Sequence, residues 1–326
     1  MKFILTFVLT SVFFASSLYG LILAVDPYNK FGFNLFGFET KAVDFARENK
    51  FNQVEHAQKD YSVFLMGSSS AHRYMTKEMN RLTNLISYNY STQSATPEDY
   101  LAMTRHILTK FKPKLILISF DFEVLNKNTK TDDMFFSSPL KKYLNEVPAN
   151  ELEADLFNNT YLTLEAIRDS VKVIWVNLFG KALHTYLDDG DHIEEPLPKS
   201  LRVKQFSYPD YTFDHKRIEY LKTLKAMATQ KGFKIIVFTS PLSPEHVEKI
   251  WQDQTLKSKH QEFKLLLAEI FGEVYDFQND GNRPYNSLQY FRDSNHPSHE
   301  FSTLVLNRIF GKEDPTNPEF GKLIKK

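Results

Sequence analysis

The chain has 326 residues, of which 42% are hydrophobic and 14% aromatic, so it is long and apolar enough to bury a sizeable core. The 40 basic residues balance the 40 acidic ones, and a formal net charge of zero gives no support for nucleic acid or a strongly charged polymer as partner. Cysteine is absent, which excludes disulfides, thiolate catalysis and cysteine-ligated metal sites but leaves the redox compartment open.

Residues 1–25 are predicted to be a transmembrane anchor. The stretch 3–25 is uncharged and mostly apolar, and a helix of that length can cross a hydrocarbon core of about 30 Å. A cleaved signal peptide would need a shorter apolar run and a small-x-small site, and the weak candidates between Ala15 and Gly20 lie well inside the run. The sequence therefore favours an anchor that places the protein against a lipid bilayer.

Charge does not fix the orientation of this anchor. Lys2 precedes the span, while Lys30 and Lys41 follow it, so the excess of positive charge is nearly the same on both sides. Residues 26–59 are rich in turn-forming and aromatic residues at first and charged later, which predicts a connector near the membrane surface with a short helix within 40–59.

From residue 60 to residue 312, apolar runs that suit strands alternate with amphipathic stretches that suit helices. This alternation predicts an α/β domain with a parallel sheet covered by helices on both faces. Ligands of such sheets bind beyond the carboxyl ends of the strands. The predicted strands are 61–66, 85–90, 114–120, 233–239 and 273–277, and the predicted helices are 72–82, 97–111, 214–231, 244–271 and 298–310.

The alternation fails between residues 126 and 211, where we expect an insertion with a helix near 162–178. Because the insertion follows the third strand, it is either a cap over the substrate cleft or an ordinary helical elaboration. The acidic turn 188–195, with His184 and His192, resembles a metal site only loosely and is interpreted as a solvated loop. No metal site is predicted, and residues 313–326 are interpreted as a C-terminal tail.

A serine lies at the end of the first predicted strand, in the sequence Gly67-Ser68-Ser69. Ser69 would stand at the carboxyl edge of the sheet, beside backbone N–H groups that can hold an oxyanion. A hydroxyl is a poor nucleophile unless a nearby imidazole takes its proton. Ser68 and Ser70 are competitors of the same chemical type, and a plain helix cap or a phosphate-binding loop is the alternative interpretation.

The imidazole and its acid are found near the other end of the chain. Asp293 precedes His296 by three residues, in a loop before the last predicted helix, so both side chains can lie on one side of a turn. In a doubly wound sheet this loop can return to the edge where the first strand ends. Ser69, His296 and Asp293 are therefore predicted as nucleophile, base and orienting acid, with His72 and His299 as alternative imidazoles.

Polar residues after the next two strands are predicted to line the same cleft. Residues 89–97 either point backbone N–H groups into it or only cap the following helix. Asp121 ends the third strand, but a carboxylate only accepts hydrogen bonds and opposes a developing oxyanion. Asn126 is the nearby side chain that could donate through its amide, if the chain turns back.

Over residues 60–312 the whole pattern resembles the SGNH hydrolase superfamily, the GDSL-like esterases and acyltransferases, whose domain is a three-layer α/β/α flavodoxin-like fold. The ending 291–310 and the Asp26-Pro27-Tyr28 connector are similar to its bacterial, membrane-anchored branch. The resemblance implies Ser69 as nucleophile, Ser94 or its neighbours at the second sequence block, Asp121 or Asn126 near the third, and Asp293 with His296 as the final pair.

The same resemblance implies a serine esterase or O-acyltransferase that needs no cofactor and faces the periplasm or exterior from the cytoplasmic membrane. Its substrate would be O-acetyl groups of cell-envelope polysaccharide, with a multi-spanning acyltransferase as a possible partner. Two departures stand out, because Ser94 replaces the usual glycine and Asp121 the usual asparagine. The second change weakens hydrolysis, moves the donor role to Asn126, or leaves an inactive scaffold or glycan-binding module. A lipase-like esterase at the bilayer surface is a third alternative.

Overall fold

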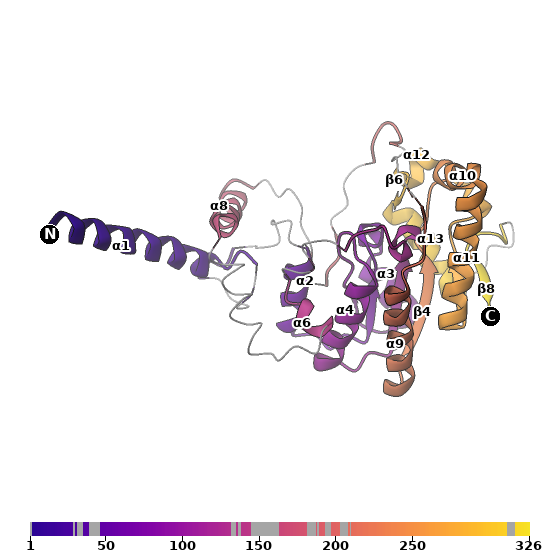
Figure 1. Cartoon of the computed structure of the whole chain (residues 1–326), viewed down its shortest axis with the longest axis horizontal. Helices are drawn as coiled ribbons and strands as arrows, with labels where there is room; N and C mark the ends of the chain where they lie inside the picture. Colours follow the sequence, from indigo (N-terminus) through magenta and orange to yellow (C-terminus); the bar gives the residue numbers. More distant parts are fainter. Residues whose placement is uncertain are drawn as a thin grey trace. The chain divides into compact units, whose positions relative to one another are not determined.

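The computed structural model describes residues 2–28, 30, 35–38, 46–131, 135, 138–144, 163–180, 187, 189–192, 197–202, 208, 210–311 and 317–326. The chain divides into two compact units (Figure 1). We call Met1–Ala57 with Met134–Leu187 the N-terminal unit, and Gln58–Asp133 with Asp188–Lys326 the sheet unit.

The N-terminal unit is helical in its described part. It contains α1 (Lys2–Val25), α2 (Ala46–Glu55), α6 (Lys141–Leu144) and α8 (Leu164–Phe179). Among the described residues, α1 is the one helix long and apolar enough to cross a membrane. A buried cluster joins the end of α1 to one face of α8, with Ile22, Val25 and Tyr28 against Ala166 and Val173.

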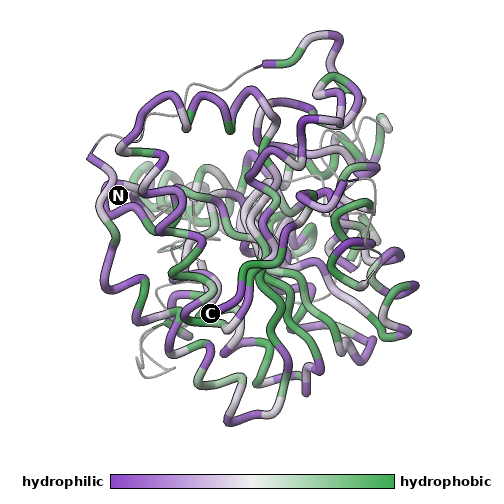
Figure 2. The backbone as a smooth tube through the Cα atoms, turned by 90° about the vertical axis from the view of Figure 1, so that its right-hand side faces the viewer, coloured by the Kyte–Doolittle hydropathy of each residue, from purple (hydrophilic) through white to green (hydrophobic). Residues whose placement is uncertain are grey.

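The sheet unit is built on a mostly parallel six-stranded sheet with the order β2-β1-β3-β4-β5-β8. The first five strands run parallel, and β8 pairs antiparallel with β5. Figure 2 shows the hydrophobic strands, drawn green, gathered together, with more hydrophilic segments around them. The strands of the sheet are β1 (Val63–Met66), β2 (Ser87–Asn89), β3 (Leu115–Phe120), β4 (Lys234–Thr239), β5 (Glu273–Asp276) and β8 (Lys322–Lys325).

Alternate positions of the strands pack against different helices, as the two-residue repeat of a strand requires. On one face Leu65 and Phe238 join a core with α3 (Thr76–Thr83) and α13 (His299–Ile309). On the other face the ring of Phe120 contacts Tyr100 of α4 (Pro97–Lys110) and Phe271 of α11 (Gln254–Phe271). The strands are buried because helices pack on both faces, which is why their sequences are continuous apolar runs.

The other elements are short or flank the sheet. They are the 3₁₀ helices η2 (Ser69–Arg73), η3 (Phe122–Leu125) and η4 (Asp280–Asn282), the helices α9 (His215–Lys231), α10 (Pro244–Gln252) and α12 (Ser287–Tyr290), and the two-stranded sheet of β6 (Phe291–Asp293) and β7 (His296–Pro297).

The α/β class, the parallel strands and the apolar N-terminal helix agree with the sequence-based prediction, but three elements differ from it. The helix predicted over 244–271 is two helices, because the Asp253 carboxylate accepts hydrogen bonds from the N–H groups of Thr255 and Leu256 and starts α11 anew. The helix predicted over 72–82 is η2 followed by α3. Part of the predicted tail, 313–326, forms the edge strand β8.

The interpretation of 188–195 as a solvated loop is wrong for its described part. Asp191 and His192 are buried. The carboxylate of Asp191 accepts hydrogen bonds from the N–H and the hydroxyl of Thr76, at 2.9 and 2.8 Å. His184 and residues 193–195 lie outside the described residues, as does much of the predicted insertion 126–211, so a cap over the cleft stays a prediction.

Candidate active site

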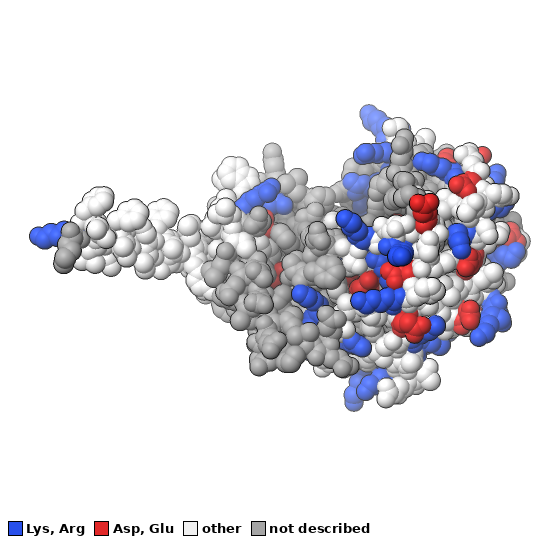
Figure 3. Space-filling view, in the orientation of Figure 1, with Lys and Arg blue, Asp and Glu red and all other residues white. Residues whose placement is uncertain are grey.

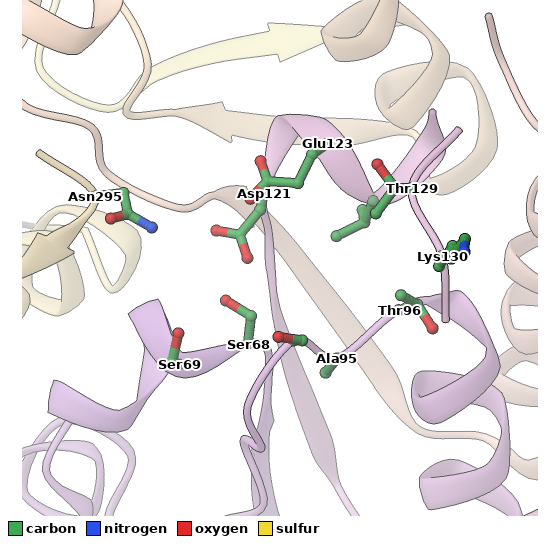
Figure 4. Close-up of a pocket in the computed structure, with 11 residues that line it drawn as sticks. Ser68, Ser69, Ala95, Thr96, Asp121, Glu123, Thr129, Lys130 and Asn295 are labelled. Atoms are coloured by element: carbon green, nitrogen blue, oxygen red, sulfur yellow. The ribbon is translucent and has the colours of Figure 1, made fainter. Parts of the chain in front are cut away.

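The chain order of the strands creates a crevice at the carboxyl ends of β1 and β3. From β1 the chain runs to β2 on one side and then to β3 on the other, and such a switch of direction leaves room for a ligand between the two strand ends. A cavity of about 270 Å³ lies there (Figure 4). It is lined by Ser68, Ser69, Ser94, Ala95, Thr96, Asp121, Glu123, Val124, Thr129, Lys130 and Asn295.

A tight turn places Ser69 at the carboxyl end of β1. A Cβ atom at Gly67 would lie 2.6 Å from the Ala71 Cβ and 3.0 Å from the Ser119 Cβ, so only glycine allows the turn to approach β3 this closely. Ser68 caps η2, its hydroxyl accepting from the Ser70 N–H at 3.2 Å. The helix-cap interpretation of this turn therefore holds for Ser68, while Ser69 becomes the first helical residue, with its side chain at the cavity.

The β6–β7 turn holds Asp293 and His296 together. The Asp293 carboxylate accepts hydrogen bonds from the backbone N–H groups of Asn295 and His296, both at 3.1 Å. The same carboxylate lies 2.8 Å from the His296 Nδ1 atom. Ser294 also holds the turn in place. Its hydroxyl lies 3.1 Å from the buried His246 Nδ1, and its carbonyl accepts from the Ser243 N–H at 3.0 Å.

The two distant segments meet at a hydrogen bond of 2.8 Å between the Ser69 Oγ and the His296 Nε2. A carboxylate can only accept, so a proton on Nδ1 of His296 is the one that satisfies Asp293. Nε2 then carries the lone pair, and the Ser69 hydroxyl donates to it. The geometry is that of a nucleophile, a base and an orienting acid in sequence. The side chains of His296 and Asp293 are only 17% and 15% exposed, which limits competition from water.

The competing serines and imidazoles have other partners. The Ser70 hydroxyl donates to Asp121 at 3.0 Å and lies 3.0 Å from that of Ser68. The His299 Nδ1 lies 2.7 Å from the Arg73 carbonyl oxygen, and the ring of His72 stacks on that of His192. Of the serines and histidines considered from the sequence, Ser69 and His296 are therefore the pair whose side chains meet.

Ser94 and its neighbours reach the cavity, as expected for the segment after the second strand. Ser94 has φ +48°, a left-handed conformation that glycine adopts more easily. The Thr92 N–H donates to the Gly67 carbonyl at 3.0 Å, which holds this loop beside the Ser69 turn. Thr96 forms a capping box with Asp99 at the start of α4, so the segment both caps a helix and lines the cleft.

Asp121 lies in the cavity wall and Asn126 does not. The Asp121 side chain is nearly buried, and Figure 4 shows its carboxylate turned toward Ser68. Burial, and to a lesser degree this carboxylate, raise the pKa of Tyr74 and of Tyr100 well above the ordinary phenol value, so both phenols stay neutral. The Asn126 Oδ1 accepts from the backbone N–H of Asn128 at 3.1 Å, which ties its amide to a neighbouring loop.

Asn295 is a polar residue of the cavity that the sequence did not single out as a site residue. It lies between Asp293 and His296, and Figure 4 shows its amide facing the cavity. Within the described residues its buried Oδ1 has no hydrogen-bond partner. Glu123, Thr129 and Lys130 also line the cavity without having been predicted. The Asp-x-Asn-His sequence is the only signal that could have drawn attention to Asn295.

No group of three or more His, Cys, Asp or Glu side chains that could hold a metal ion occurs among the residues that the structure describes. Comparison of the chain with protein-family models and with curated proteins finds no match.

Proposed function

We propose that this protein is a membrane-anchored serine esterase or O-acyltransferase of the SGNH hydrolase superfamily, with a three-layer α/β/α flavodoxin-like domain. One observation carries the proposal: the Ser69 Oγ lies 2.8 Å from the His296 Nε2, whose Nδ1 lies 2.8 Å from Asp293. More than two hundred residues separate Ser69 from His296. A chain has little structural reason to bring a half-buried hydroxyl, an imidazole and a carboxylate together at a cavity in this order.

In the proposed mechanism Ser69 Oγ attacks the acyl carbonyl while its proton passes to His296 Nε2. Asp293 orients the ring and stabilises the imidazolium. The tetrahedral intermediate collapses when His296 returns the proton to the leaving alcohol, which leaves the acyl group on Ser69. Water or a sugar hydroxyl then attacks the acyl-serine with His296 as base, and Ser69 is regenerated.

The oxyanion is held by groups at the ends of β1 and β2 and by Asn295. Ser69 is the first residue of η2, so its N–H has no partner inside that helix and is suited to the developing charge. The loop at Ser94 lines the same cavity, and its backbone N–H groups would be further donors. The Asn295 amide takes the donor role for which Asp121 is unsuited and from which Asn126 is held away.

The cavity favours a short acyl group on a neutral or hydroxyl-rich substrate. Its volume of about 270 Å³ suits an acetyl group better than a long acyl chain. Asp121 and Glu123 disfavour an anionic substrate and can accept hydrogen bonds from sugar hydroxyls, and Lys130 adds a donor. These features support O-acetyl groups of cell-envelope polysaccharide as the substrate over the lipids of a lipase-like esterase.

The N-terminal helix supports a location at the cytoplasmic membrane. Figure 3 draws the side chains along α1 white, as expected for a span without charge after Lys2. The similarity of 291–310 and of the Asp26-Pro27-Tyr28 connector to anchored members supports a catalytic domain on the periplasmic or outer side. A multi-spanning acyltransferase that delivers the acyl group would be a partner of a protein in this place.

A second candidate function is a catalytically silent envelope scaffold or glycan-binding module. Asp121 favours it, because a nearly buried carboxylate lies in the wall of the cavity where the superfamily usually has an amide donor. Such a module would keep the fold and bind sugar without breaking an ester.

Fluorophosphonate labelling separates the two candidates. We expect the full-length protein to be labelled and Ser69→Ala to lose the label entirely, because the reagent needs a serine activated by an imidazole. Ser70→Ala is the matched control, since Ser70 bonds to Asp121 and not to a histidine, and it keeps the label. Absence of label on the wild-type protein would favour the scaffold, and label that persists in Ser69→Ala would move the nucleophile elsewhere. Release of acetate from acetylated polysaccharide then tests the substrate class.

A further inference from the structure

One face of α8 is apolar and exposed. The opposite face is packed: Ala166 and Val173 belong to the buried cluster with the end of α1, and Asp169 accepts a hydrogen bond from the Tyr28 hydroxyl at 2.9 Å. Residues spaced by three and four positions share a helix face. The exposed apolar face consists of Leu164 at 80% exposure, Val171 at 52%, Trp175 at 58%, Leu178 at 63% and Phe179 at 60%.

The depth of α8 relative to a bilayer follows from the number of α1 residues that are needed to cross the hydrocarbon core. A hydrocarbon core of about 30 Å takes up about 20 helical residues. Counted from Phe3, this length ends near Ile22, and Ile22 is one of the residues against which α8 packs. A span that stopped before the contact with α8 would be too short. If α1 spans the membrane, α8 therefore lies at the level of the bilayer surface, beside the end of the span (Figure 1).

The composition of the exposed face suits that level. Trp and Phe side chains are favoured at the boundary between headgroups and acyl chains, and the rings of Trp175 and Phe179 lie 4.3 Å apart as one aromatic patch. Arg168 shares the exposed face, and its long side chain can place its charge among phosphates while its stem stays with the apolar residues.

We propose that α8 is an interfacial helix that inserts its Leu164–Phe179 face into the acyl-chain boundary of the same membrane that α1 crosses. The protein would then contact the bilayer through two helices, α1 across it and α8 in its surface. The second contact restricts rotation of the N-terminal unit about the α1 axis. The inference rests on the proposal that α1 spans a membrane and is independent of the serine chemistry.

The two tryptophans of the chain allow a direct test, because each can be studied alone. Full-length Trp251→Phe protein, reconstituted in phosphatidylcholine vesicles, reports only Trp175. We expect its emission to be blue-shifted and to lose most of its intensity when the lipid is brominated near the carbonyl end of the acyl chains, with less loss for bromine near the chain ends. This matches a depth of about 5–10 Å for an interfacial helix. Trp175→Phe protein, which reports Trp251 on α10, is the matched control for quenching of a tryptophan outside the proposed interfacial helix.

A third variant tests the anchor separately. In a background with both tryptophans replaced by Phe, Phe13→Trp places a reporter in the middle of α1, and bromine near the chain ends should quench it strongly. Quenching of this reporter without quenching of Trp175 overturns the proposal for α8 alone. A blue-shifted but unquenched Trp175 also overturns it, because a second copy or a partner protein then covers the face. If neither reporter is quenched, the anchor is wrong and the interfacial helix with it, while fluorophosphonate labelling still decides the serine chemistry.

Discussion

Asn295 lies between the acid and the base of the proposed catalytic pair, and its side chain is turned into the cavity. Its backbone N–H donates to Asp293 at 3.1 Å, so the side-chain amide is the donor that Asn295 can offer to a substrate. The side chain of Asn295 can therefore be substituted while the backbone hydrogen bond that holds the turn is kept.

We expect Asn295→Ala to lower kcat for an acetyl ester by roughly 10- to 100-fold with little change in KM, because a donor to the oxyanion acts mainly in the transition state. Asn295→Asp, which has the same shape but only accepts and brings a negative charge, should lose more. Rates of 4-nitrophenyl acetate hydrolysis measure both. An unchanged kcat in the Ala variant, with label still present on Ser69, would exclude Asn295 from the oxyanion site.

At the scale of single residues, the sequence could predict the position of residues next to the end of a strand or the start of a helix. Ser69 follows an apolar strand and a glycine, and Asp293 and His296 precede a helix start, so their placement at one sheet edge could be inferred. The direction of a side chain within a loop could not. The sequence offers Asn126 as a candidate amide donor, yet its Oδ1 is held by backbone N–H groups, and Asn295 faces the cavity.

The strand β2 is stabilised along its outer edge by residues 189–192. The Asn89 N–H donates to the Asp189 carbonyl at 2.9 Å, and Asp191 binds the first residue of α3. Gly190 makes this approach feasible, because it has φ +80° and a Cβ there would collide with the Asn89 carbonyl oxygen.

Gly190→Ala should therefore destabilise the sheet unit by roughly 2–4 kcal/mol, from left-handed strain and from the collision with backbone. Gly232→Ala is the matched control. It has nearly the same φ, +78°, but nothing lies within 4 Å of its Cβ, so only the strain of about 1–2 kcal/mol applies. Thermal unfolding of both variants, with hydrogen exchange of β2 as a local readout, compares them. Equal losses would mean that the close approach to Asn89 contributes nothing.

Elements with a strong local signal could be predicted, and elements fixed by distant contacts could not. Strands β3 and β4 are long apolar runs and lie where the sequence placed them. β8 has only four residues, two of them lysine, and it is a strand because β5 offers it an edge. The buried docking of 189–192 likewise depends on partners a hundred or more residues away, so the acidic composition alone indicates a solvated loop.

At the scale of the whole molecule, the division into an apolar N-terminal helix and an α/β domain follows from composition and periodicity. Composition and periodicity do not predict which segments of the chain belong to which unit. Met134–Leu187 belongs with the N-terminal unit, although in the chain it lies in the middle of the sheet unit. Long-range packing such as that between α8 and the end of α1 determines this arrangement, and local periodicity carries no information about it.

The N-terminal unit also contains a buried carboxyl group that should make its stability depend on pH. Burial raises the pKa of Glu48 in α2 from an ordinary 4.5 to about 7, while Lys30 lowers it in part. The folded unit thus prefers the protonated form. The contribution of protonated Glu48 to the free energy of unfolding is fully present below about pH 4.5. It declines as the pH rises and is lost once the pH passes about 7, a change of about 3 kcal/mol in all.

Glu48→Gln should abolish most of this dependence, because glutamine is a neutral side chain of the same size. Hydrogen exchange of α2 in the full-length protein, corrected for the intrinsic effect of pH, measures the local stability between pH 4.5 and pH 7. We expect protection to fall across this range in the wild-type protein and to stay nearly level in Glu48→Gln. Glu219→Gln, on the exposed surface of α9, should behave as the wild type in α2. Wild-type protection that instead rises toward pH 7 would show that Glu48 is ionised in the folded protein and stabilised by Lys30.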